Sequence, residues 1–173
     1  ERLWGLYLGM MLAMAVLNSM LFLLLKDRDF IYLVLYICAI LIQASMLDGR
    51  IKDLLPADLG IQYRIIQPLL TIPPLFTLLL FSSSFLKIKQ YSPRLHQIFR
   101  AFFVLLALMT LLIPIIDRYL VSLLFLVLSI PIIIVVLISG WIVWKNGYQP
   151  ARFFVLAMSI PLLIAIIEPA DAL

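Results

Sequence analysis

Charge is scarce in this chain, and so are the residue types that bind metals or catalyse reactions. Asp, Glu, Lys and Arg make up only 13% of the 173 residues, and there is one histidine and one cysteine. The lone Cys38 excludes an internal disulfide framework and a cysteine metal cluster. The lone His96 has no second ligand nearby in sequence, and we expect it to be solvated in a loop. No glycine-rich phosphate loop is present either. The sequence therefore predicts no catalytic site, no metal and no cofactor.

Hydrophobic residues are abundant instead, at 65% of the chain. Soluble domains are close to half apolar and about a quarter charged. A domain of this size leaves much of its surface exposed, so such a composition cannot be hidden in a water-soluble core. The sequence therefore predicts an integral membrane protein surrounded by lipid.

Six apolar runs, each without a charged residue, predict six transmembrane α-helices that form one polytopic, all-α domain. About 20 helical residues cross the hydrocarbon core of a bilayer. We expect a kink at the prolines of the third run, with Thr71 or Thr77 bonding to the freed carbonyls. We expect Ser82, Ser83 and Ser84 to meet the headgroups, and residues 87–100 to form a loop. The runs are 3–25, 30–47, 65–86, 101–116, 119–144 and 153–167.

The distribution of Lys and Arg predicts the orientation of these helices. Eight of the 13 basic residues follow the first, third and fifth runs, and short cytoplasmic loops are enriched in such residues. We therefore expect the N-terminus outside and a basic cytoplasmic loop after the third run. The basic residues lie singly between apolar runs, so the net charge of +4 indicates contact with lipid headgroups and not with nucleic acid. The residues of the predicted basic loop are Lys87, Lys89, Arg94 and Arg100.

Four uncharged residues inside the runs are candidates for helix packing or for a ligand cavity. Gly5 and Gly9 form a small-xxx-small pattern, which favours close helix packing within the chain or in a homodimer. Asn18 and Gln43 are polar groups at membrane depth and need partners. Hydrogen bonds between helices and the lining of a ligand cavity are both open for them.

No charged residue lies inside any run, although ion- and proton-coupled carriers usually have one at membrane depth. A small-molecule transporter or carrier subunit is therefore the alternative function and not the first.

Several segments, in this order, resemble the membrane domain of bacterial seven-transmembrane receptors with diverse intracellular signalling modules. Phe30 departs from the pattern, where the family favours tyrosine, and no seventh run is present. We therefore expect a longer protein cut before its seventh helix. The matching segments are Gly5 to Gly9, Asn18, Lys26 to Asp29, Tyr32, Tyr36, Gly49, Phe81 to Leu86, Pro93 to Leu95, Pro150 to Phe154 and Ala157.

This resemblance implies a multi-pass sensor of the bacterial inner membrane. An extracytoplasmic sensory domain would precede the helices, and a cytoplasmic output domain would follow them. The output would be a histidine kinase of a two-component system, a diguanylate cyclase or a phosphatase. The helices would relay a signal between the two, and the resemblance supplies no catalytic residue for this chain.

Overall fold

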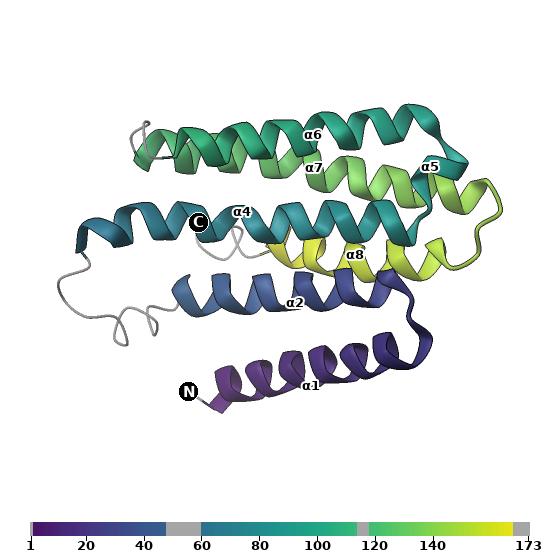
Figure 1. Cartoon of the computed structure of the whole chain (residues 1–173), viewed down its shortest axis with the longest axis horizontal. Helices are drawn as coiled ribbons and strands as arrows, with labels where there is room; N and C mark the ends of the chain where they lie inside the picture. The colour runs from purple at the N-terminus through teal and green to yellow at the C-terminus, as the bar shows by residue number, and fades with distance from the viewer. Residues whose placement is uncertain (1, 48–59, 114–117, 168–173) are drawn as a thin grey trace.

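The computed structural model describes residues 2–47, 60–113 and 118–167, and every regular element in them is an α-helix. Six long helices run back and forth along one axis, with a single short helix between two of them (Figure 1). The helices are α1 (Arg2–Leu25), α2 (Arg28–Leu47), α4 (Gly60–Phe85), α5 (Ile88–Tyr91), α6 (Pro93–Leu112), α7 (Arg118–Lys145) and α8 (Ala151–Ile167).

The predicted runs and the observed helices differ most at the expected loop 87–100. This segment contains α5 and the first two turns of α6, so Lys89, Arg94 and Arg100 are helical. The helix expected at 101–116 begins at Pro93, which occupies a position where a missing N–H costs nothing. Leu95 and Phe99 are buried whereas Arg94 and Arg100 are exposed. The charged residues thus lie on one face of a helix and do not interrupt it.

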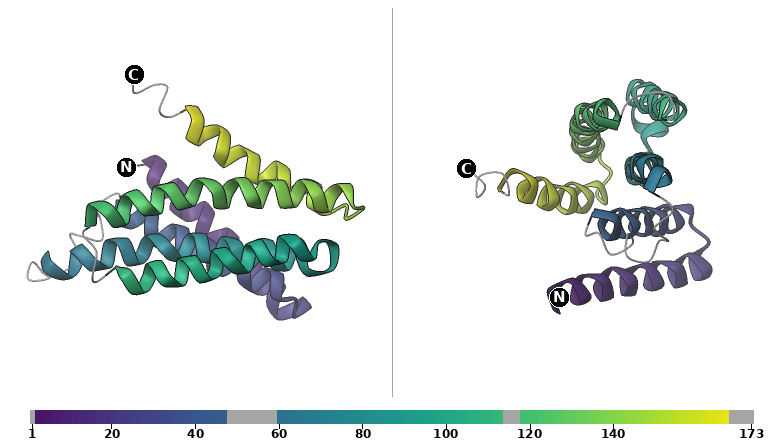
Figure 2. Two further views of the ribbon diagram at one scale, coloured as in Figure 1. Left: turned by 90° about the horizontal axis from the view of Figure 1, so that it is seen from above. Right: turned by 90° about the vertical axis from the view of Figure 1, so that its left-hand side faces the viewer.

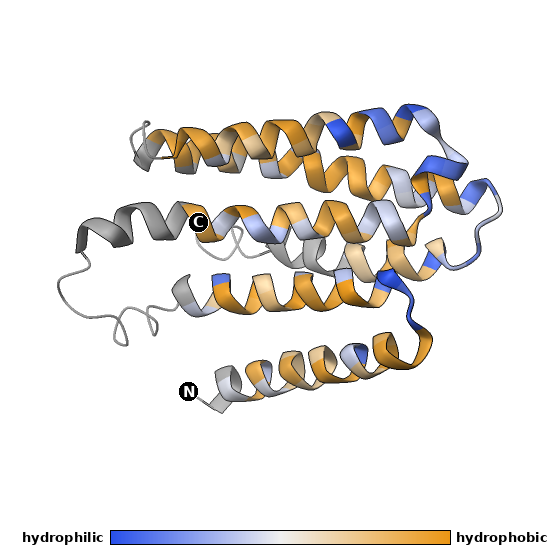
Figure 3. Ribbon diagram, viewed as in Figure 1, coloured by the Kyte–Doolittle hydropathy of each residue, from blue (hydrophilic) through white to orange (hydrophobic). Residues whose placement is uncertain are grey.

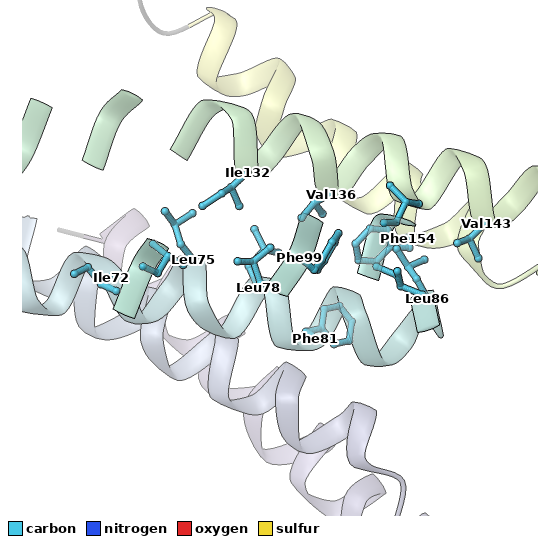
Figure 4. Packing of buried hydrophobic residues seen from close by; sticks show 14 of the residues in the cluster. Ile72, Leu75, Leu78, Phe81, Leu86, Phe99, Ile132, Val136, Val143 and Phe154 are labelled. Atoms are coloured by element: carbon cyan, nitrogen blue, oxygen red, sulfur yellow. The ribbon is translucent and has the colours of Figure 1, made fainter. Parts of the chain in front are cut away.

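Helix α4 holds the bundle together. It contacts α2, α5, α6 and α7, whereas α1 packs on no described helix other than α2 (Figure 2). The core is accordingly built around α4, where Ile72, Leu75 and Leu78 face Ile132 and Val136 of α7 (Figure 4). Helix α8 joins this core through Phe154, which is 4% exposed.

The outward faces of the bundle are apolar. Leu23 and Leu24 of α1 are 72% and 79% exposed, and Leu111 of α6 is 70% exposed. A soluble monomer rarely exposes continuous apolar surface on this scale. By length and composition, four segments among the described residues could cross a membrane, and α4 holds a shorter apolar stretch at Leu69–Phe85. The four segments are Gly5–Leu25, Arg28–Ser45, Pro93–Leu112 and Leu123–Lys145.

The prolines of α4 interact with Thr77 differently from the expectation. The Thr77 hydroxyl donates to the carbonyls of Pro73, at 2.7 Å, and Pro74, at 3.2 Å. The carbonyls that these two prolines deprive of an α-helical donor belong to Leu69 and Leu70, four residues earlier. Thr77 therefore makes the usual bond to the preceding turn and does not compensate for the missing N–H groups.

Gly140 of α7 lies close to α8. A Cβ atom at this position would lie 2.8 Å from Cγ2 of Val155 and 3.1 Å from the Phe154 ring of α8. Only a glycine lets the two backbones come this close. The small side chains of Ser82 in α4 and Ser139 in α7 are both fully buried.

We therefore expect Gly140→Ala to separate α7 from α8 and to lower the free energy of unfolding by about 1–3 kcal/mol, because it overpacks a close contact. Thermal unfolding in detergent measures this. Gly9→Ala is the matched control, since no atom lies within 4 Å of its Cβ position. Equal stability of the two variants would contradict the prediction.

Candidate functional site

One end of the bundle carries most of the described charged residues. All three connections α1–α2, α4–α5–α6 and α7–α8 lie at this end, which we call the basic end (Figure 3). The fold brings together there the residues that sequence analysis assigned to one side of the membrane. They are Lys26, Arg28, Lys87, Lys89, Arg94, Arg100, Lys145 and Arg152.

A side-chain hydrogen bond links α2 to α4 at the basic end. The Ser84 hydroxyl, in the last turn of α4, donates to Oδ1 of Asp29, in the first turn of α2. The backbone N–H of Asp29 in turn donates to Oδ1 of Asp27 at 3.2 Å. A carboxylate in the first turn of a helix is also favoured by the helix dipole. The expectation that Ser84 would simply meet headgroups is therefore wrong, and that for Ser82 is too, because Ser82 is buried and donates to the Leu78 carbonyl at 2.6 Å.

Tyr148, in the α7–α8 connection, links this contact to α5. Its ring lies 5.6 Å from that of Tyr91 in α5, and the Lys87 ammonium lies 5.6 Å from its centroid. Burial raises the pKa of the Tyr148 hydroxyl above its ordinary value, and the negative charge of Asp29 raises it further. We call the four side chains Asp29, Ser84, Lys87 and Tyr148 the polar junction.

Local backbone geometry positions Tyr148. Gly147 has a φ of 97°, which glycine adopts without strain. Its N–H donates to the Trp144 carbonyl at 3.0 Å, and that of Tyr148 donates to the Val143 carbonyl at 3.3 Å. These two bonds form a Schellman motif that ends α7 and turns the chain toward α5.

Aromatic rings surround the polar junction on its inner side. Phe85 of α4 lies 5.9 Å from Phe154 of α8 and 6.5 Å from Tyr148, and Phe81 lies 6.0 Å from Phe154. The polar junction thus lies at the end of the bundle, and the aromatic layer lies next to it on the inner side. Together they connect α2, α4, α5 and α8.

The candidates Gly5, Gly9 and Asn18 all lie in α1. Gly5 and Gly9 are exposed, and nothing lies within 4 Å of their Cβ positions. Close packing within the chain is made by Gly140 instead, and a contact of the two α1 glycines with a second copy stays a prediction. Asn18 is 9% exposed, and its amide donates to the Met14 carbonyl of the same helix at 2.8 Å.

Gln43 lines a cavity of about 330 Å³ between α2, α4, α7 and α8. Ile40 and Tyr36 of α2 lie on the same wall, about one and two helical turns from it. Pro74, Leu75 and Leu78 of α4 face them, and the remaining lining residues are apolar side chains of α7 and α8. The sequence indicated Gln43 but not the other helices, because no local pattern pairs α2 with α7.

His96 differs from its expected setting. It lies in the first turn of α6, half-buried, and its Nδ1 is buried without a hydrogen-bond partner. It is therefore not a solvated loop residue. Across the described ranges, no three His, Cys, Asp or Glu side chains are grouped as metal ligands would be.

An apolar helical bundle with one charged end is the arrangement of a multi-pass membrane domain. The family model described as 7TM diverse intracellular signalling matches residues 1–172. The chain belongs to this family. It is thus a multi-pass membrane signalling domain, as the resemblance predicted. Searches of curated proteins and of solved structures found no match.

The polar junction generates a prediction about stability. Ser84→Ala removes the donor to Asp29, and we expect it to lower the free energy of unfolding by about 1–2 kcal/mol, because it leaves a carboxylate without its partner. Ser83→Ala is the control, since its hydroxyl makes no hydrogen bond with the described residues. Thermal unfolding in detergent compares them, and an unchanged Ser84→Ala variant would show that the bond does not stabilise the fold.

Proposed function

We propose that this chain is the transmembrane signal-transducing domain of a sensor in a bacterial inner membrane. The family match over residues 1–172 is the observation that carries the proposal. In this proposal an extracytoplasmic sensory domain supplies the signal. A cytoplasmic kinase, cyclase or phosphatase domain receives it, and the helices themselves catalyse nothing.

The proposed orientation places the basic end in the cytoplasm and the N-terminus outside. Eight of the 13 basic residues but only two of the nine acidic ones, Asp27 and Asp29, belong to this end. Short loops with such an excess of Lys and Arg remain on the cytoplasmic side during insertion. Lys145 also stacks over Trp141, at 5.5 Å, as is typical of the headgroup level.

The polar junction supplies a route for the signal. It connects the first turn of α2, the end of α4 and the turn between α7 and α8, all of which lie at the basic end. A shift of α2 along α4 would stretch the bond between Asp29 and Ser84. The signal would therefore act as a change in the balance of two arrangements of these helix ends.

Cysteine labelling tests the orientation. In a Cys38→Ser background we expect Asn146→Cys, in the exposed α7–α8 turn, to resist a membrane-impermeant maleimide in intact spheroplasts and to react after permeabilisation. Lys52→Cys, between α2 and α4, is the control and should react in both cases. The reverse labelling pattern would show that the proposed orientation is wrong.

Signalling is tested in the parent receptor. Because Ser84→Ala weakens a link between helix ends, we expect it to change the basal output of the attached domain by about fivefold or more. Ser83→Ala should leave that output unchanged. Phosphotransfer or cyclic-dinucleotide formation in membranes measures the effect. If the parent gene encodes no signalling domain, or if the output is insensitive to both variants, the relay proposal fails.

A further inference from the structure

The cavity between α2, α4, α7 and α8 is partly open at the surface of the bundle. Its volume of about 330 Å³ falls within the size range of small-molecule sites, which begins near 300 Å³. Its apolar walls include Leu75, Leu78 and Val136, which face one another between α4 and α7 (Figure 4).

Two polar side chains, Tyr36 and Gln43, lie on one wall of the cavity. Neither the Tyr36 hydroxyl nor the Gln43 amide forms a hydrogen bond with any described residue, although both line the cavity. They are seven residues apart on α2 and hence on one face, about 10 Å from each other along the axis. Polar groups at membrane depth are costly when unsatisfied, so both favour an occupant with complementary hydrogen-bonding groups.

The cavity lining also limits the charge of the occupant. None of its ten lining residues is Asp, Glu, Lys, Arg or His. A charged molecule would lose its hydration here without gaining a counter-ion, which is strongly unfavourable at membrane depth. An uncharged molecule with an apolar body gains from the eight apolar lining residues and can still bond to the two polar ones.

We infer that this cavity is a binding site for a small uncharged amphiphile, with Gln43 and Tyr36 forming hydrogen bonds to its polar group. Because the occupant touches α2 on one side and α7 and α8 on the other, it would favour one spacing of these helices. Any effect of that spacing on output rests on the proposed function, whereas the binding itself does not.

Binding of 1-aminoanthracene to the purified chain in nanodiscs tests the site. This uncharged aromatic amine should bind saturably, at one molecule per chain, with a rise in fluorescence. Gln43→Leu keeps the size of the side chain but removes its hydrogen bonds, and we expect it to weaken binding about fivefold to tenfold. Anthracene, which lacks the amine, should bind equally to both proteins.

Three substitutions locate the bound probe. Leu137→Trp should fill the cavity and abolish binding of both probes. Ile40→Phe adds less volume, on the opposite wall, and should weaken the binding of both probes. Val104→Trp, on the exposed face of α6, should change neither. Circular dichroism and thermal unfolding select the variants that remain folded.

Absence of saturable binding, or equal binding to the wild type and the folded filling variants, would overturn the inference, because the probe would then be dissolved in lipid. Equal losses of aminoanthracene and anthracene on Gln43→Leu would overturn the assigned role of Gln43. All of these readouts are independent of any output domain, so a failure of the proposed function would leave them unchanged.

Discussion

Lipid removes the hydrophobic effect as a force between helices, and the rest of this structure depends on that constraint. Helices in hydrocarbon associate through close packing and a few polar contacts. The chain provides the first at Gly140, where α7 lies close to Phe154 and Val155 of α8. It provides the second at the basic end, where Asp29 accepts a hydrogen bond from Ser84.

The long helices could be predicted from the sequence because the length of each apolar run is close to that of a helix that crosses a bilayer. The family could be predicted too, since its features follow one another in order along the chain. The start of α6 could not be predicted, because a run without charged residues does not include the helical turns that carry Arg94 and Arg100 on their outer face. The bond between Asp29 and Ser84 spans 55 residues, and no local pattern indicates which helix ends will meet.

The close contact of Gly140 could not be predicted, for a related reason. Gly5 and Gly9 match a pattern for close packing, but the pattern gives no information about the partner, and α2 is the one described helix that contacts α1. Gly140 lies in a run of bulky apolar residues, in which only the adjacent Ser139 is also small. The cavity was predicted in part: Gln43 was identified as a polar group in need of a partner, whereas the walls from α4, α7 and α8 required the fold.

The position of α1 has a mechanical consequence. Among the described helices, only α2 contacts this helix, and most of its remaining surface is apolar and exposed. A pulling force on the N-terminus would therefore load a single interface, and α1 would leave the bundle before any contact around α4 is strained. In an extraction experiment with a cantilever, the first rupture should release one helix of 24 residues, while the remaining helices keep their core.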